Sequence, residues 1–193
     1  MSELPASSIG RLRNELPKGA AEALARVVGG CTTAGGLWRF FRPEAVTVWN
    51  SPQVWRSTWP GLTPGLLFFG EDVFGNQLAL KQGSENAWLW NHENSELIDL
   101  LLDPATLLET VIQSGVDWID FYTAEMLAVG RAKLLDVPEN CHLHWTQPLI
   151  LGGLVTTGNT SAVEKGMHLR GHGSLWAQIH GLPPGTELVI KPK

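Results

Sequence analysis

The stretch FFGEDVFGNQLALK, from Phe68 to Lys81, decides the fold, because two apolar runs flank a short acidic turn that carries two glycines. Residues 66–69 predict one strand and residues 77–81 the next, since short apolar runs bounded by turn residues are typical of buried strands. Gly75, followed by Asn76, can adopt the positive φ angles that tight hairpin turns require. The stretch therefore predicts a β-hairpin.

A third strand is predicted at residues 87–91, AWLWN. Trp88 and Trp90 would point to the same face of this strand, because strand side chains alternate. We expect that face to be a core or a covered surface. Three sequential strands joined by short turns form an antiparallel meander.

Helical signals surround the meander. Asp103 followed by Pro104 predicts a helix start with an apolar stripe behind it, and Asp117 is expected to cap a second helix. Four further elements are expected: a short strand near 45–49, a helix over about 162–180 that starts at the S-x-x-E spacing of 161–164, and two short helices within 1–36.

Together these elements predict an α+β fold. A central, mostly antiparallel sheet of about four to six strands carries helices packed on one face, with the C-terminal helix at its side or edge. A chain of 193 residues fits a single domain. Within it we expect an N-terminal helical segment over 1–36, a core over 37–135 and a C-terminal strand and helix extension over 136–193.

Nearly all of the net charge of −5 comes from the middle of the chain. Residues 61–140 hold thirteen acidic and three basic side chains, whereas the segments on either side are slightly basic. A negative field repels phosphates, which argues against nucleic acid as a partner. It favours a basic partner, and it equally fits a solvated acidic surface that keeps the protein soluble.

The sequence also bounds the compartment. No apolar run approaches the ~18 residues of a membrane span, and the N-terminal segment lacks the apolar region of a signal peptide. The two cysteines, Cys31 and Cys141, are too few for a disulfide framework. We therefore expect a cytoplasmic protein that binds no membrane. Of the nine tryptophans, most are expected in the core and a minority as exposed interface anchors.

Two pairs of histidines are the sharpest metal candidates. His142 and His144 would share one face of a strand, and His168 and His172 would share one face of a helix. Four imidazoles could hold zinc. However, only Cys141 stands beside them at ligand spacing, and helical histidine pairs are common on surfaces. The sequence therefore predicts no metal and no cofactor, although a buried pocket lined by two or more histidines would favour a ligand-binding protein or an enzyme.

No catalytic signature stands out in the sequence. GHGSLW, around Ser174, lacks the second glycine of a nucleophile elbow, and LGGLVTTGNT lacks the lysine of a phosphate-binding loop. A cysteine and histidine pair could be drawn, but any sequence with these counts allows the same drawing. We therefore expect no catalytic residues and a protein that is not an enzyme.

Three stretches carry a family resemblance: FFGEDVFGNQLALK, ENAWLWNHENSE and DPATLLETVI. Their order of apolar strand, acidic turn with F-G-N, two further strands, acidic loop and helix resembles the SUKH superfamily of small α/β proteins, which includes glucan-synthesis regulators. The C-terminal part, from PLILGG through VEKGMHLRGHGSLWAQIHGL, is similar to the C-terminal region of type VI secretion immunity proteins. The two matches cover about residues 40–181.

Many bacterial members of the superfamily are immunity proteins, which neutralise toxins delivered between neighbouring cells. The resemblance therefore implies a non-enzymatic, immunity-type protein that binds a protein toxin, such as a basic nuclease or another cytoplasm-acting enzyme, and occludes its active site. Glu71, Asp72, Glu93 and Glu96 would supply electrostatic complementarity to a basic cleft, and exposed tryptophans would supply the anchors.

Two alternatives stay open. The first is a regulatory or scaffold protein that binds a cellular enzyme, as the glucan-synthesis regulators of the superfamily do. The second is a small-ligand-binding protein or an enzyme built around the histidines.

Overall fold

A six-stranded antiparallel meander forms the centre of the computed structural model, which describes residues 31–33, 36–59, 65–114, 119, 121–183 and 185–187. Each strand pairs with the next one along the chain, so the spatial order is β1-β2-β3-β4-β5-β6. The strands are β1 (Cys31–Thr33), β2 (Trp38–Phe40), β3 (Leu66–Asp72), β4 (Gln77–Lys81), β5 (Ala87–Asn91) and β6 (Glu96–Asp99). The helices expected within 1–36 lie almost wholly outside the described residues.

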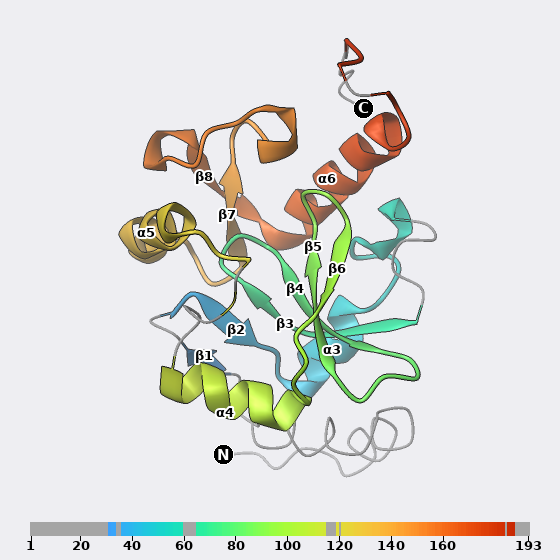
Figure 1. Cartoon of the computed structure of the whole chain (residues 1–193), viewed down its shortest axis with the longest axis vertical. Helices are drawn as coiled ribbons and strands as arrows, with labels where there is room; N and C mark the ends of the chain where they lie inside the picture. The colour runs from blue at the N-terminus through green and yellow to red at the C-terminus, as the bar shows by residue number, and fades with distance from the viewer. Residues whose placement is uncertain are drawn as a thin grey trace.

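A second, two-stranded antiparallel sheet and four α-helices complete the described part of the chain (Figure 1). The small sheet pairs β7 (Cys141–Trp145) with β8 (Thr160–Glu164). The helices are α3 (Pro43–Trp49), α4 (Pro104–Ser114), α5 (Ala124–Lys133) and α6 (Lys165–Ile179), and short 3-10 turns include η2 (Arg56–Thr58). The predicted α+β class is confirmed.

The hairpin that opened the sequence analysis has the predicted form. β4 and β5 have the expected bounds, and β3 extends three residues further than expected, to Asp72. Gly75 adopts a φ of +100° in the turn between β3 and β4. Phe68 and Phe69 lie on opposite faces of the sheet, as neighbouring residues of a strand do, and the register with β4 shifts between Phe68 and Gly70.

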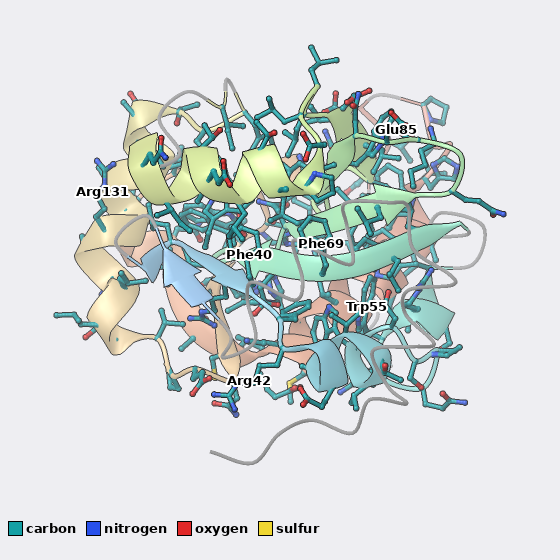
Figure 2. All side chains as sticks on the ribbon, turned by 90° about the horizontal axis from the view of Figure 1, so that it is seen from below. Phe40, Arg42, Trp55, Phe69, Glu85 and Arg131 are labelled. Carbon is teal, nitrogen blue, oxygen red and sulfur yellow. The ribbon has the colours of Figure 1, made fainter. Side chains whose placement is uncertain are left out.

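Both faces of the sheet are covered. One face packs against α4 and α5 through residues such as Leu107 and Leu127. The other carries a cluster in which Trp90 of β5 meets Trp55, Trp59 and Leu169 of α6. Figure 2 shows α4 on one side of the sheet and Trp55 on the other. Helices were expected on one face, with the C-terminal helix at the side or edge of the sheet. This position is corrected, because α6 and the η2 turn lie against the second face.

Two predicted elements near the ends of the sheet are corrected. Residues 45–49 form the end of α3 and not a strand, because Pro43 fits the first helical position and starts the helix. The second helix of the pair after β6 is α5, whose cap is Thr123, since its side chain accepts a hydrogen bond from the Met126 N–H. The expected cap, Asp117, lies outside the described residues.

The start of the last helix is also corrected. Residues 160–164 pair with β7 as a strand, so the helix begins at Lys165 and not near 162. Glu164, expected inside the helix, instead caps it by accepting hydrogen bonds from the N–H groups of Gly166 and Met167. None of the helices in the described ranges has the length and apolar character that a membrane crossing requires.

α6 approaches the η2 turn most closely at Gly173. A Cβ atom on Gly173 would overlap Thr58 Oγ1 and would lie 2.6 Å from Trp59 Nε1. Both neighbours are held in place, since Thr58 Oγ1 donates to the Trp55 carbonyl and Trp59 Nε1 donates to the Leu169 carbonyl. The glycine therefore lets the helix reach the sheet.

We expect Gly173→Ala to lower the free energy of unfolding by about 1–3 kcal/mol, because the added methyl group has no room. Gly171→Ala is the matched control in the same helix, since no atom lies within 4 Å of its Cβ position. That substitution is expected to raise the free energy of unfolding by about 0.5–1 kcal/mol. Urea unfolding measures both values, and effects of the same sign would rule out the close approach as the reason for Gly173.

Candidate functional site

Five histidines meet where the end of β5, the strand β7 and the helix α6 come together. Neighbouring rings lie with centroids 4.6–5.5 Å apart and face one another edge to face. The five are His92, His142, His144, His168 and His172; His144 is half-buried and the other four are buried. The predicted same-face pairs are confirmed, but the expectation that the helical pair lies on the surface is wrong.

A chain of hydrogen bonds from β3 orients His92. Asp72 accepts hydrogen bonds from the backbone N–H and the side-chain amide of Asn76, and the Tyr122 hydroxyl donates to the same carboxylate. Because the side-chain nitrogen of Asn76 donates to Asp72, the atom of Asn76 that lies 3.1 Å from His92 Nδ1 is its side-chain oxygen, which can only accept a hydrogen bond. His92 must then carry its proton on Nδ1, which leaves a lone pair on Nε2.

A second chain from the same strand orients His168. Glu71 lies 3.0 Å from His142 Nε2, and His142 Nδ1 lies 3.1 Å from His168 Nδ1. A neutral His142 donates its Nε2 proton to the carboxylate and accepts the Nδ1 proton of His168. His168 is then left with a lone pair on Nε2. Lys165, at the start of α6, forms an ion pair with the other oxygen of Glu71.

The ring nitrogens and carboxylate oxygens that lack a hydrogen-bond partner lie close together. His92, His168 and His172 each offer a ring nitrogen, and these atoms all lie within 4.8 Å of one another. Their Nε2 atoms and both carboxylate oxygens of Glu93 are buried without a hydrogen-bond partner. Glu93 Oε1 lies 3.8 Å from the Nε2 atoms of both His92 and His172. Imidazole nitrogens and carboxylate oxygens in such a group are donors that bind transition metals.

Burial also sets the charge state of the cluster. It is the main reason why the pKa values of His92 and His168 fall well below the usual value and why that of His172 falls to about 3, with repulsion among the imidazoles adding to it. The rings are therefore uncharged at neutral pH.

Burial raises the pKa of Glu93 to about 7. The backbone N–H groups of Ile150 and Leu149 face this carboxylate and oppose the shift, but neither completes a hydrogen bond with it. Glu93 is thus a buried carboxylate that no cation of the described residues neutralises at hydrogen-bond distance. A cation placed beside it would stabilise its ionised form.

A pocket of about 320 Å³ opens on the outer side of the cluster. Its apolar side includes Ile150 and the stacked rings of Phe74 and Trp145, whose centroids are 5.2 Å apart. Its polar side includes His92 and Glu93. His92 is the one histidine that lines this pocket, so the expected sign of a histidine-built ligand site, a pocket lined by two or more histidines, is not met here.

The four acidic residues predicted to bind a partner have different environments. Glu71 and Asp72 are fully buried and are engaged by the internal hydrogen bonds described above, so they present no charge at the surface; this part of the prediction is corrected. Glu93 is buried at the wall of the pocket. Glu96 is exposed and remains available to a partner.

The prediction of exposed tryptophan anchors is also corrected. Trp118 lies outside the described residues, and each of the other eight is buried or half-buried. The described part of the chain therefore has no exposed tryptophan to serve as an anchor. The strongly exposed apolar side chains are aliphatic: Val48, Leu101, Ile112, Leu135, Leu154 and Met167.

His92 and Glu93 are the cluster residues that the sequence analysis did not connect with the histidine pairs. They lie in the acidic loop after β5, about 50 residues before β7 and about 75 before the histidines of α6. Spacing rules apply within one helix or strand, so they find pairs but not a third residue from another segment. The adjacent H-E dipeptide directly after a buried strand was the available signal.

Comparisons with known proteins show the fold and no more. No family model and no curated protein matches the sequence. The structure is similar to the crystal structure of Atu4351 from Agrobacterium tumefaciens, with a TM-score of 0.59 and 15% sequence identity over 90% of this chain and 82% of that chain.

Proposed function

We propose that the chain is a non-enzymatic, immunity-type protein that binds a basic protein toxin in the cytoplasm and covers its active site. The resemblance to the SUKH superfamily and to type VI secretion immunity proteins supports this function. The three stretches that carry the first resemblance form β3, β4, β5 and α4, in the order that the resemblance implies.

The observation that carries the proposal is the pocket beside Ile150. A preformed pocket with an apolar wall and a polar rim is the usual receptor for one aromatic or long aliphatic anchor of a partner protein. Two acidic residues are close in sequence to residues of this pocket: Glu96 follows Asn94 by two positions, and Glu125 directly precedes Met126. Both acids are exposed, so they offer negative charge to a basic surface that approaches this part of the chain.

Co-expression tests this function directly. The chain is produced together with the product of the gene immediately upstream of its own gene, and surviving cells are counted. We expect the wild-type chain to restore growth. Ile150→Glu is expected to reduce survival at least about 10-fold, because a charge at the rim of the apolar pocket removes an anchor contact of roughly 2 kcal/mol.

Val48→Glu is the matched control, since Val48 is also an exposed aliphatic residue but lies on α3 and does not line the pocket. It should protect as well as the wild-type chain does. Failure of the wild-type chain to protect would reject the immunity function. Equal loss in both variants would reject the pocket as the docking site.

A second candidate function is a small-ligand-binding protein or an enzyme, because the histidine cluster adjoins the pocket through His92 and Glu93. Turnover of a substrate by the purified chain would favour it over the first proposal. A regulatory or scaffold protein is distinguished from both by a gene without a toxin neighbour and by an enzyme of the same cell as the partner.

A further inference from the structure

We propose that His92, His168, His172 and Glu93 bind one divalent transition-metal ion of the zinc class. The inference rests on the buried donor atoms alone and is independent of the immunity-type function. It assigns the loop after β5 and the helix α6 to one metal site.

Hydrogen-bond acceptors face one another at the centre of this cluster. The hydrogen bonds to Asn76 and His142 leave lone pairs on Nε2 of His92 and His168, and the carboxylate of Glu93 lies against the same space. Acceptors repel one another, and each buried polar atom left without a partner destabilises the fold. A cation at their centre satisfies all of them at once.

Hydrogen bonds at their Nδ1 atoms hold two of the three rings, His92 and His168, in place. The chains Asp72–Asn76–His92 and Glu71–His142–His168 each end in a buried carboxylate of β3. Histidines that bind metals usually donate their other ring N–H to such a partner, which fixes the orientation of the ring and makes its lone pair a better ligand. A histidine that merely fills a core needs no such alignment of its free nitrogen.

The kinds of donor atom and their spacing also favour zinc. Zinc takes imidazole and carboxylate ligands in tetrahedral geometry at about 2.0–2.2 Å, so its ligand atoms lie roughly 3.4 Å apart. The three ring nitrogens lie within 4.8 Å of one another, and Glu93 Oε1 lies 3.8 Å from two of them. Side-chain movements of about 1 Å would bring four donors onto the ion. His144, whose Nδ1 also lacks a partner, lies at the edge of the same group.

Four protein donors make a closed site of the structural kind, because catalytic zinc sites keep a position for water or substrate. His168 and His172 belong to α6, and His92 and Glu93 directly follow β5. The ion would therefore tie the C-terminal helix to the end of the main sheet and would stiffen the wall of the pocket that His92 and Glu93 line.

Metal titration of the full chain, freed of any tag and treated with a chelator, tests the site. Added Co²⁺ is expected to give the visible absorption of a tetrahedral complex, and about one equivalent of Zn²⁺ per chain should abolish it, with a dissociation constant below about 1 µM. At a zinc concentration about 100 times that constant, the midpoint of thermal unfolding should rise by roughly 5–10 °C.

Variants of the chain then locate the ion. His168→Gln and His172→Gln are each expected to weaken zinc binding at least about 100-fold, and Glu93→Gln about 10–100-fold. His180→Gln is the matched control, since His180 is an exposed histidine at the end of α6, and it should bind zinc as the wild-type chain does. Far-ultraviolet circular dichroism without metal shows whether each variant is folded.

Zinc X-ray absorption of the wild-type complex supplies a readout that needs no variant. The inference predicts three imidazole ligands and a carboxylate oxygen at about 2.0–2.2 Å. Fewer than two imidazoles at the bound zinc, zinc affinity unchanged in both α6 variants, or no binding of Co²⁺ and Zn²⁺ by the folded wild-type chain would each overturn it.

Discussion

Glu71→Gln is expected to lower the free energy of unfolding by about 3 kcal/mol at neutral pH. Glu71 is fully buried on β3, where it pairs with Lys165 and accepts a hydrogen bond from His142. The amide keeps an acceptor for the histidine but removes the negative charge, so the largely buried ammonium group of Lys165 loses its partner. Urea unfolding at pH 7 measures the difference.

Glu96→Gln provides the matched control, because it makes the same chemical change at an exposed position of β6. We expect it to alter the free energy of unfolding by less than about 0.5 kcal/mol. The sequence placed both residues in one partner-binding set. If the two substitutions cost the same, the internal role that the structure gives Glu71 is wrong.

The pH dependence of this difference follows from the pKa of Glu71. Burial raises that pKa, but the interactions with His142 and Lys165, a hydrogen bond and an ion pair, outweigh burial and lower it from 4.5 to about 2. Because the folded-state pKa lies below the unfolded value, the stabilisation is complete above pH 4.5 and is lost as the pH falls toward 2. The difference between the wild-type chain and Glu71→Gln should therefore shrink over that pH range.

Gly75→Ala is expected to cost about 2–4 kcal/mol, from two separate causes. Its φ of +100° is unfavourable for a residue with a side chain. In addition, a Cβ atom there would lie 2.8 Å from His142 Nδ1 and 3.0 Å from His168 Nδ1, the two atoms that share a hydrogen bond. The methyl group would push this pair apart, so zinc affinity should fall together with stability.

Gly83→Ala separates the two causes. Gly83 has a φ of +80°, but no atom lies within 4 Å of its Cβ position. Only the unfavourable φ angle applies at this position, so we expect Gly83→Ala to lower the free energy of unfolding by about 1 kcal/mol and to leave zinc affinity unchanged. Similar losses for the two glycines in urea unfolding, or zinc affinity that survives Gly75→Ala, would show that the histidine pair does not depend on this turn.

The central strands could be predicted from the sequence because local rules determine them. Apolar runs, turn glycines and the alternation of Trp88 and Trp90 gave the right bounds for β4 and β5 and the right shared face. The expected strand near 45–49 was wrong because it also relied on a local rule. Val46 and Val48, with one polar residue between them, fit both a strand and a short helix. Pro43 decides for the helix, and proline at the first helical position was the signal to weigh more heavily.

The S-x-x-E spacing before α6 failed for a tertiary reason. Residues 160–164 pair with β7, and this partner lies about 20 residues earlier in the chain. A capping pattern read from one segment cannot reveal such a pairing. Glu164 still caps the helix, but as the residue before its first turn.

The candidate site was half predictable. Spacing of two on a strand and four on a helix paired the histidines of β7 and α6 correctly. Burial could not be read from spacing, and the third ligand, His92, comes from a distant loop. The acidic pair Glu71 and Asp72 looked like a charged turn, whereas the strand β3 continues through it and places both carboxylates behind histidines. The acidic residues of the stretch from Phe68 to Lys81 thus orient the histidines of the site through buried hydrogen bonds.

Zinc content per chain is the most direct test of the claim that the buried histidines form a metal site and not a polar core. Protein produced in zinc-containing medium, purified without chelator and cleaved from its tag is desalted and measured by elemental analysis. We expect about one zinc ion per wild-type chain, and close to none in His172→Gln prepared alongside. A folded wild-type chain that retains no zinc, both as purified and after reloading and desalting, would contradict it.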